Sequence, residues 1–137
     1  MKTVNFDLAQ LKYDEKLNVL FFRVKQDIEV DVKEIGEMLR YVEEFMGPKR
    51  HLCVVDFGTH VSSSSEARKL YADSPYIQNY RIADAFLVKS LALSLVANFF
   101  IQITKPKVKT RMFSDENQAV EWLLKMAEQE TGFTATK

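Results

Sequence analysis

Apolar and polar side chains alternate through residues 1–30 in two runs, residues 3–13 and 17–24. A short polar segment, Asp14-Glu15-Lys16, separates the two runs. A period of two on either side of a polar turn is typical of a β-hairpin, so we expect this segment to form an antiparallel hairpin. The apolar positions that carry this prediction are Val4, Phe6, Leu8, Leu17, Val19 and Phe21.

The spacing of apolar side chains changes to that of a helix after Asp31. Within residues 32–46 these side chains recur three and four positions apart, which predicts an amphipathic helix with its apolar stripe against a sheet. Asp31 and Glu34 have the spacing of a capping box, and Gly47 stands where a C′ glycine is expected. The helix should therefore begin after Asp31 and end at Gly47.

Strand-like and helix-like segments alternate in the rest of the chain. Nearly continuous apolar runs are typical of strands that are buried on both faces, and the intervening segments have helical spacing. The expected strands cover residues 51–57, 81–90 and 108–113; the expected helices cover 63–73, ended by Pro75, and 116–130, capped by Ser114 or Asp115.

One α/β domain accounts for this order of segments. Strand-helix alternation implies βαβ crossovers and parallel neighbours, whereas the hairpin supplies an antiparallel edge. A chain of 137 residues can bury about 68% of the surface that it exposes when unfolded. We expect a single domain, residues 1–137, with a small, mostly parallel mixed sheet and about four flanking helices, ending in a frayed tail at residues 131–137.

Residues 90–103 are apolar except at four positions, which lie four residues apart. On a helix each such step rotates by roughly 40°, so the polar stripe covers only about 120° and leaves a wide apolar arc. One interpretation is a helix buried between the sheet and a neighbouring helix. The other is a dimer face or the wall of an apolar pocket. The polar positions are Ser90, Ser94, Asn98 and Gln102, and the candidate face comprises Leu91, Leu95, Phe99 and Phe100.

A strand is also compatible with this segment, because every odd position from Leu91 to Ile103 is apolar. The leucine and alanine content favours a helix. Two parallel strands also need a crossover between them, and this segment stands where that crossover is expected. We therefore expect a helix.

Net charge and cysteine content limit the classes of protein to which this chain can belong. Lysine plus arginine equals aspartate plus glutamate at 19 each, so no net field draws in nucleic acid or an anionic membrane. Cys53 is the only cysteine, which excludes an internal disulfide and favours a reducing compartment, by default the cytoplasm. The longest apolar segment, 91–103, is interrupted by polar residues and shorter than the roughly 20 residues of a membrane span.

Asp56-Phe57-Gly58 matches the metal-binding triplet of protein kinases. The chain has neither the glycine-rich loop nor the catalytic loop of a kinase, so this match is discarded. Asp56 remains a candidate contact for a ligand or partner because it ends a strand, and α/β sheets bind ligands beyond the carboxyl ends of their strands. The simpler interpretation is a turn residue.

His51 and Cys53 lie two apart, so a strand would place them on one face. A structural zinc site needs four ligands, and His60 is the only other histidine of the chain. We therefore predict no metal and no cofactor. A cysteine within a buried apolar run behaves as a small hydrophobic residue, which argues against a nucleophile.

A basic cluster follows the broad apolar segment. If this stretch is extended, alternation projects its cations to one side, which makes it the best local anion-binding candidate. A solvated edge strand whose lysines discourage edge-to-edge pairing explains the pattern equally well. The cluster comprises Lys105, Lys107, Lys109 and Arg111.

Four consecutive serines, Ser62, Ser63, Ser64 and Ser65, precede the helix expected at 63–73. Ser63 with Glu66 fits a capping box, which is the simplest role for one of these hydroxyls. A phosphate at a helix N-terminus would also meet a favourable dipole, so a regulated serine is the alternative.

The segment 81–125, "RIADAFLVKSLALSLVANFFIQITKPKVKTRMFSDENQAVEWLLK", resembles the SpoIIAA-like branch of the STAS superfamily. The resemblance rests on a strand that leads into a long apolar helix, a short strand ending in Phe113, and the sequence Ala119-Val120-Glu121-Trp122-Leu123. This last element is similar to the family's terminal A-x-W-L helix.

This resemblance implies a small mixed sheet flanked by helices, without catalytic machinery. Anti-sigma-factor antagonists of the superfamily are phosphorylated on a serine of an Asp-Ser-Ser-Gly-type loop. The corresponding loop here, "GTHVSSSSEA", has serines but lacks the adjacent aspartate and the glycine. The branch is also similar in fold to CRAL-TRIO lipid-transfer domains, which implies that the apolar helix can wall a pocket.

Together these features predict a non-enzymatic, cytoplasmic, dimeric module. Its expected partner is a protein, bound through the loop at residues 58–66, with Asp56, Gly58 and the four serines as candidate contacts. The alternative is a carrier or sensor of a small apolar or lipid-like ligand, held between the helix at 90–103 and the sheet. An enzyme with an anion site near Asp56 is disfavoured because no base, nucleophile or metal cluster is visible.

Overall fold

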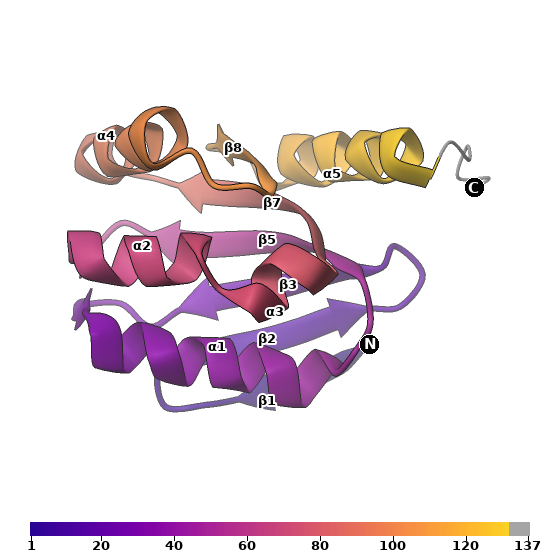
Figure 1. Ribbon diagram of the computed structural model, residues 1–137, viewed down its shortest axis with the longest axis horizontal. Helices are drawn as coiled ribbons and strands as arrows, with labels where there is room; N and C mark the ends of the chain where they lie inside the picture. Colours follow the sequence, from indigo (N-terminus) through magenta and orange to yellow (C-terminus); the bar gives the residue numbers. More distant parts are fainter. Residues whose placement is uncertain (132–137) are drawn as a thin grey trace.

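The computed structural model describes residues 1–131 and contains a six-stranded mixed sheet with the strand order β1-β2-β3-β5-β7-β8 (Figure 1). The β1-β2-β3 pairs are antiparallel, whereas the β3-β5, β5-β7 and β7-β8 pairs are parallel. The predicted α/β class with an antiparallel N-terminal edge is therefore confirmed. The strands are β1 (Lys2–Asn5), β2 (Ala9–Asp14), β3 (Val19–Val24), β5 (His51–Gly58), β7 (Arg81–Val88) and β8 (Lys109–Phe113).

The N-terminal segment is more elaborate than the predicted two-stranded hairpin. The first run breaks at residues 6–8, where the backbone N–H of Phe6 donates to Ala9 O at 2.8 Å, because the Phe6 ring turns aside and stacks on Tyr41 at 4.0 Å between centroids. A further strand, β4 (Ile28–Val30), pairs in parallel with β6 (Val61–Ser63) as a separate two-stranded sheet. Neither short strand was predicted, since each is only three residues long.

Within residues 1–131, five α-helices and one π-helical turn flank the sheets, against the expected number of about four helices. The predicted capping box of Asp31 and Glu34 is confirmed at the start of the first helix. The helices are α1 (Val32–Met46), α2 (Ser65–Ala72), α3 (Pro75–Tyr80), α4 (Leu91–Phe99) and α5 (Glu116–Thr131), and the π-helical turn η1 is Phe100–Thr104.

Two helix boundaries differ from the prediction. The helix expected over 63–73 begins only at Ser65, because Ser63 belongs to β6 and Ser64 is the N-cap. The helix ends at Ala72, three residues before Pro75, and Pro75 occupies the first helical position of α3, where a proline N has no hydrogen bond to lose. The tail predicted to fray at 131–137 lies outside the described residues, apart from Thr131 at the end of α5.

The two faces of the large sheet bury separate hydrophobic clusters. Side chains alternate along β5, so that Cys53 and Val55 join one cluster while Leu52 and Val54 join the other. Residues of α1, α2 and α4 cover the first face, and α5 covers the second. In Figure 1, α1 and α2 lie in front of the stacked strands and run roughly along them. The face beneath α4 is the one that carries the candidate site.

Candidate ligand-binding site

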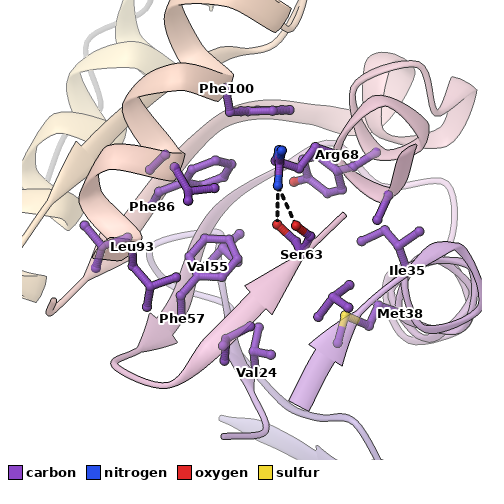
Figure 2. Close-up of a pocket in the computed structure, with 17 residues that line it drawn as sticks. Val24, Ile35, Met38, Val55, Phe57, Ser63, Arg68, Phe86, Leu93 and Phe100 are labelled. Carbon is purple, nitrogen blue, oxygen red and sulfur yellow. Dashed lines mark hydrogen bonds between the residues drawn. The ribbon is translucent and has the colours of Figure 1, made fainter. Parts of the chain in front are cut away.

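A cavity of about 100 Å³ lies between α4, the sheet and the helices α1 and α2 (Figure 2). Its wall is almost entirely hydrocarbon, since the strands and helices turn valine, leucine, isoleucine and aromatic side chains toward it. An apolar space of this scale suits a molecule about the size of benzene. The lining residues are Val24, Val30, Ile35, Met38, Val55, Phe57, Val61, Ser63, Ala67, Arg68, Tyr71, Phe86, Val88, Leu93, Val96, Ala97 and Phe100.

Aromatic rings make up one wall of this cavity. Phe86 of β7 packs edge-to-face against Phe57, with 5.2 Å between ring centroids, and lies 5.6 Å from Phe100. Tyr71 of α2 lies 6.3 Å from Phe100. Such contacts hold the rings in fixed positions, so the cavity wall is preformed.

Two polar side chains, Ser63 and Arg68, also line the cavity. The guanidinium Nη1 of Arg68 donates to the backbone oxygen of Ser63 at 2.7 Å and to its Oγ at 2.9 Å. Figure 2 shows this guanidinium group directed among the apolar side chains, with both hydrogen bonds dashed. The cavity therefore has one cationic side.

The four serines have different surroundings. The Oγ of Ser64, not that of Ser63, caps α2 by accepting from Ala67 N at 3.1 Å, so the predicted capping box of Ser63 and Glu66 is wrong. The reason is register: β6 extends through Ser63 and places the helix start one residue later. Ser62 and Ser65 are exposed.

Asp56 lies within β5, beside the register shift between Asp56 and Gly58, so the turn interpretation is wrong. Its Oδ1 accepts a hydrogen bond from Gly58 N at 2.9 Å, and its Oδ2 lies 3.5 Å from Nε of Arg23. Strand alternation places Asp56 with Val54 on the opposite face of the sheet from the cavity-lining Val55. Gly58, the last residue of β5, has a φ of +63°, which favours glycine at this position. Asp56 stands just before the loop at residues 58–66 and Gly58 at its start, but neither residue lines the cavity.

The candidate apolar face on the helix at 90–103 divides into two parts. Phe100 is only 3% exposed and lines the cavity, whereas Leu91, Leu95 and Phe99 are 76%, 62% and 52% exposed. The helix is confirmed, but it ends at Phe99 and continues as the π-helical turn η1. With Ile103, which is 63% exposed, the three exposed side chains form a stripe at four-residue spacing, here called the outer stripe.

The basic cluster does not form one extended segment, which the anion-binding interpretation required. Lys105 has a φ of +52° directly after η1, and only Lys109 and Arg111 belong to β8. The side chain of Arg111 lies over the Phe113 ring, with 5.2 Å between Cζ and the centroid. β8 is an edge strand of the large sheet, as the edge-strand interpretation requires. Lys107 and Lys109 border a surface groove on the α5 side, away from the cavity.

A buried network of polar side chains holds Tyr71, one of the residues that line the cavity. Arg81 of β7 donates to Asp84, to the Tyr71 hydroxyl at 2.8 Å and to Nε2 of His51 at 3.2 Å. Tyr71 in turn donates to Asp84 Oδ2 at 2.5 Å. The network thus pins one aromatic wall residue of the cavity to the sheet. Sequence reasoning missed it, although an arginine and an aspartate three apart within an apolar strand were a visible signal.

Protonation in this network is fixed by burial. Burial and the neighbouring Arg81 lower the pKa of His51 to about 3, so the ring is neutral. Its Nδ1 faces the Lys49 carbonyl at 2.8 Å and must carry the proton, which leaves Nε2 as the acceptor for Arg81. Both ring nitrogens are therefore occupied and unavailable to a metal. Burial raises the pKa of Cys53 to about 12, which keeps the thiol protonated and unreactive.

The fold is SpoIIAA-like. A crystal structure of an uncharacterized protein from the DUF3478 family, from Shewanella loihica PV-4 and described as having a SpoIIAA-like fold, matches with a TM-score of 0.61. The two chains are 13% identical, and the match covers 90% of this chain and 99% of the other. The family resemblance seen in the sequence is therefore confirmed at the level of the fold.

The chain belongs to the family described as a domain of unknown function (DUF7793), whose model matches residues 13–127. A comparison with curated proteins found no match. Within residues 1–131, no helix is both long and apolar enough to cross a bilayer.

Proposed function

We propose that this protein is a non-enzymatic binding module for a small, largely apolar ligand, held in the cavity between α4 and the sheet. The observation that carries the proposal is the cavity itself, which is preformed, lined with hydrocarbon and bordered by aromatic rings. Such a pocket is the default ligand site of a domain of this kind. Of the two functions considered from the sequence, the carrier or sensor of an apolar ligand is thus the better supported.

A ligand in the cavity would also contact elements that reach the protein surface. The cavity lining includes Ser63, which belongs to the loop at residues 58–66, and Val96 and Ala97 of α4, whose outer stripe is exposed. A ligand that orders these elements would alter the surface that a partner meets. Binding of a ligand and binding of a protein partner are therefore compatible roles for one module.

The test is a titration of the protein with hexan-1-ol, followed by methyl NMR shifts. Saturable shifts are expected at Val55 and Leu93, which line the cavity. Ala97→Leu should fill the cavity and abolish these shifts. Ala92→Leu is the matched control, since Ala92 lies on the same helix but is exposed. Native mass spectrometry of protein purified gently from its host should show extra mass that is lost on denaturation.

A second candidate function is a protein-interaction module, which the outer stripe favours. Leu91, Leu95, Phe99 and Ile103 are each more than half exposed, and contiguous apolar surface of this kind marks interaction sites. A homodimer or a protein partner would cover it, together with the loop at residues 58–66. Capture of a partner that is lost on Phe99→Asp and unaffected by Lys109→Asp would support this role.

A further inference from the structure

Arg68 differs from Arg81, the other arginine near the cavity, in how its charge is compensated. Arg81 is 3% exposed and is neutralised by Asp84, with Tyr71 and His51 completing its hydrogen bonds. The side chain of Arg68 instead bonds to neutral groups, the two oxygens of Ser63. Within residues 1–131, no carboxylate oxygen lies within the 4.0 Å of an ion pair with its guanidinium group.

The hydrogen bonds of Arg68 leave part of the guanidinium group available. The Arg68 side chain makes two hydrogen bonds with the described residues, and Nη1 is the donor in both. A guanidinium group carries five N–H donors in a planar fork, so Nε and Nη2 can still donate. The hydrogen bonds to Ser63 hold the guanidinium group on the cavity side. Less conformational entropy of Arg68 is therefore lost when a ligand binds.

The surroundings of Arg68 make a neutral ligand a poor match. A partly buried cation beside hydrocarbon loses hydration, and this cost is recovered only when an anion pairs with it. A carboxylate matches the arginine fork with two parallel hydrogen bonds. The remaining wall accepts only an apolar group.

From this juxtaposition we infer that the ligand is an anionic amphiphile, a small carboxylic acid whose apolar body fills the cavity and whose carboxylate pairs with Arg68. The inference rests on the proposed function and adds the chemical class of the ligand. Because the cavity measures about 100 Å³, the apolar body is a short aliphatic chain or a single ring.

Three probes with the same six-carbon chain test this assignment on the full chain: hexanoate, hexan-1-ol and hexyl phosphate. Dissociation constants come from the methyl shifts of Val55 and Leu93. Hexanoate is expected to bind at least tenfold more tightly than hexan-1-ol. Arg68→Gln should remove this preference, so that the two probes bind equally, and Arg111→Gln, which changes an exposed arginine of β8, should leave it intact.

The results of these titrations test the chemical class of the ligand and the binding site separately. Equal binding of hexanoate and hexan-1-ol to the unsubstituted protein would overturn the role of Arg68 and leave the apolar cavity as the binding site. Tighter binding of hexyl phosphate than of hexanoate would overturn the carboxylate. Absence of shifts with all three probes would overturn the proposed function as well. Arg68→Lys, which keeps the charge but not the fork, should retain part of the preference and provides a folded variant if Arg68→Gln unfolds.

Discussion

The hydroxyl of Ser64 donates to Oδ1 of Asp31 at 2.7 Å and so joins the N-termini of α1 and α2. The same Ser64 oxygen accepts from Ala67 N, and the same Asp31 oxygen accepts from Val32 N. Two helix caps therefore share one hydrogen bond. Hydrogen bonds from Ser64 and from Val32 lower the pKa of Asp31.

Replacement of Ser64 by alanine should lower the free energy of unfolding by about 1 kcal/mol, because α2 loses its N-cap. Urea unfolding at neutral pH measures the change. Ser65→Ala is the matched control, since the Ser65 hydroxyl contacts only the exposed Glu66 at 3.3 Å. A loss for Ser65→Ala as large as that for Ser64→Ala would contradict the assigned cap.

The same geometry bears on the serine that a kinase could modify. A phosphate on Ser64 would place about two negative charges beside the Asp31 carboxylate and remove the cap. Ser64→Glu is therefore expected to destabilise the fold, whereas Ser62→Glu, at an exposed position, should leave the unfolding midpoint unchanged. A stable Ser64→Glu variant would show that the shared cap is dispensable.

The adjacent phenylalanines at the end of α4 should respond oppositely to a charge. Phe100→Asp buries a carboxylate beside the cavity and should cost about 3 kcal/mol or more. Phe99→Asp changes a side chain that is 52% exposed and should leave the protein folded, as near-ultraviolet circular dichroism would show. If the outer stripe forms a dimer, sedimentation of this variant should also report a monomer. An unfolded Phe99→Asp variant would place Phe99 in the core.

The buried His51 predicts a pH dependence of stability. Its pKa of about 3 in the fold lies below the unfolded value of 6.5, so the unfolded chain binds more protons between these values. Its contribution is complete above pH 6.5 and is lost as the pH falls toward 3. Between pH 7 and pH 5 the loss is about 2 kcal/mol.

Urea unfolding at these two pH values measures the effect. His51→Gln should remove most of the difference between pH 7 and pH 5, whatever its effect at pH 7. His60→Gln changes the other, exposed histidine and should retain the difference. An unchanged pH dependence in His51→Gln would assign the effect to other groups.

A methyl group at Gly58 should destabilise the end of β5. The backbone has a φ of +63°, and an added Cβ would lie 2.6 Å from the amide of Gln26. That amide donates to Phe57 O and accepts from Thr59 N and His60 N, so it cannot move without loss. Gly58→Ala is expected to cost about 2 kcal/mol.

Gly36 provides the control for this substitution. It lies inside α1, and an added Cβ would contact nothing within 4 Å. Gly36→Ala should stabilise the protein by up to about 1 kcal/mol through helix propensity. Chemical unfolding of the two variants should therefore give shifts of opposite sign, and equal shifts would contradict the geometry at Gly58.

Local patterns predicted those elements whose signals are contained in a few neighbouring residues. The capping box of Asp31 and Glu34 and the buried strand at 51–57 were read correctly, because caps and buried strands depend on adjacent side chains. The errors fell where a distant contact decides the outcome. Phe6 leaves its strand to stack on Tyr41, and Ser63 is held in β6 by pairing with Val30.

The candidate site was only partly predictable for the same reason. The apolar segment 90–103 was interpreted as a buried helix, a pocket wall or a dimer face, but its sequence could not tell Phe99 from Phe100. Their exposures of 52% and 3% follow from how α4 lies on the sheet. Arg68 carried no signal at all in the sequence, since its importance depends on the absence of a carboxylate near it in space.

By itself, the sequence determined the α/β class, the order of most elements and the broad apolar arc, because periodicity and caps are local properties of the chain. Only the tertiary structure decided which apolar side chains line a cavity, which serine caps a helix and which arginine lies at that cavity with neutral hydrogen-bond partners. These outcomes depend on residues that are far apart in the chain, such as Val24 and Phe100, coming to line one space. The physical reason is that burial and charge compensation are properties of neighbours in space, which no local pattern specifies.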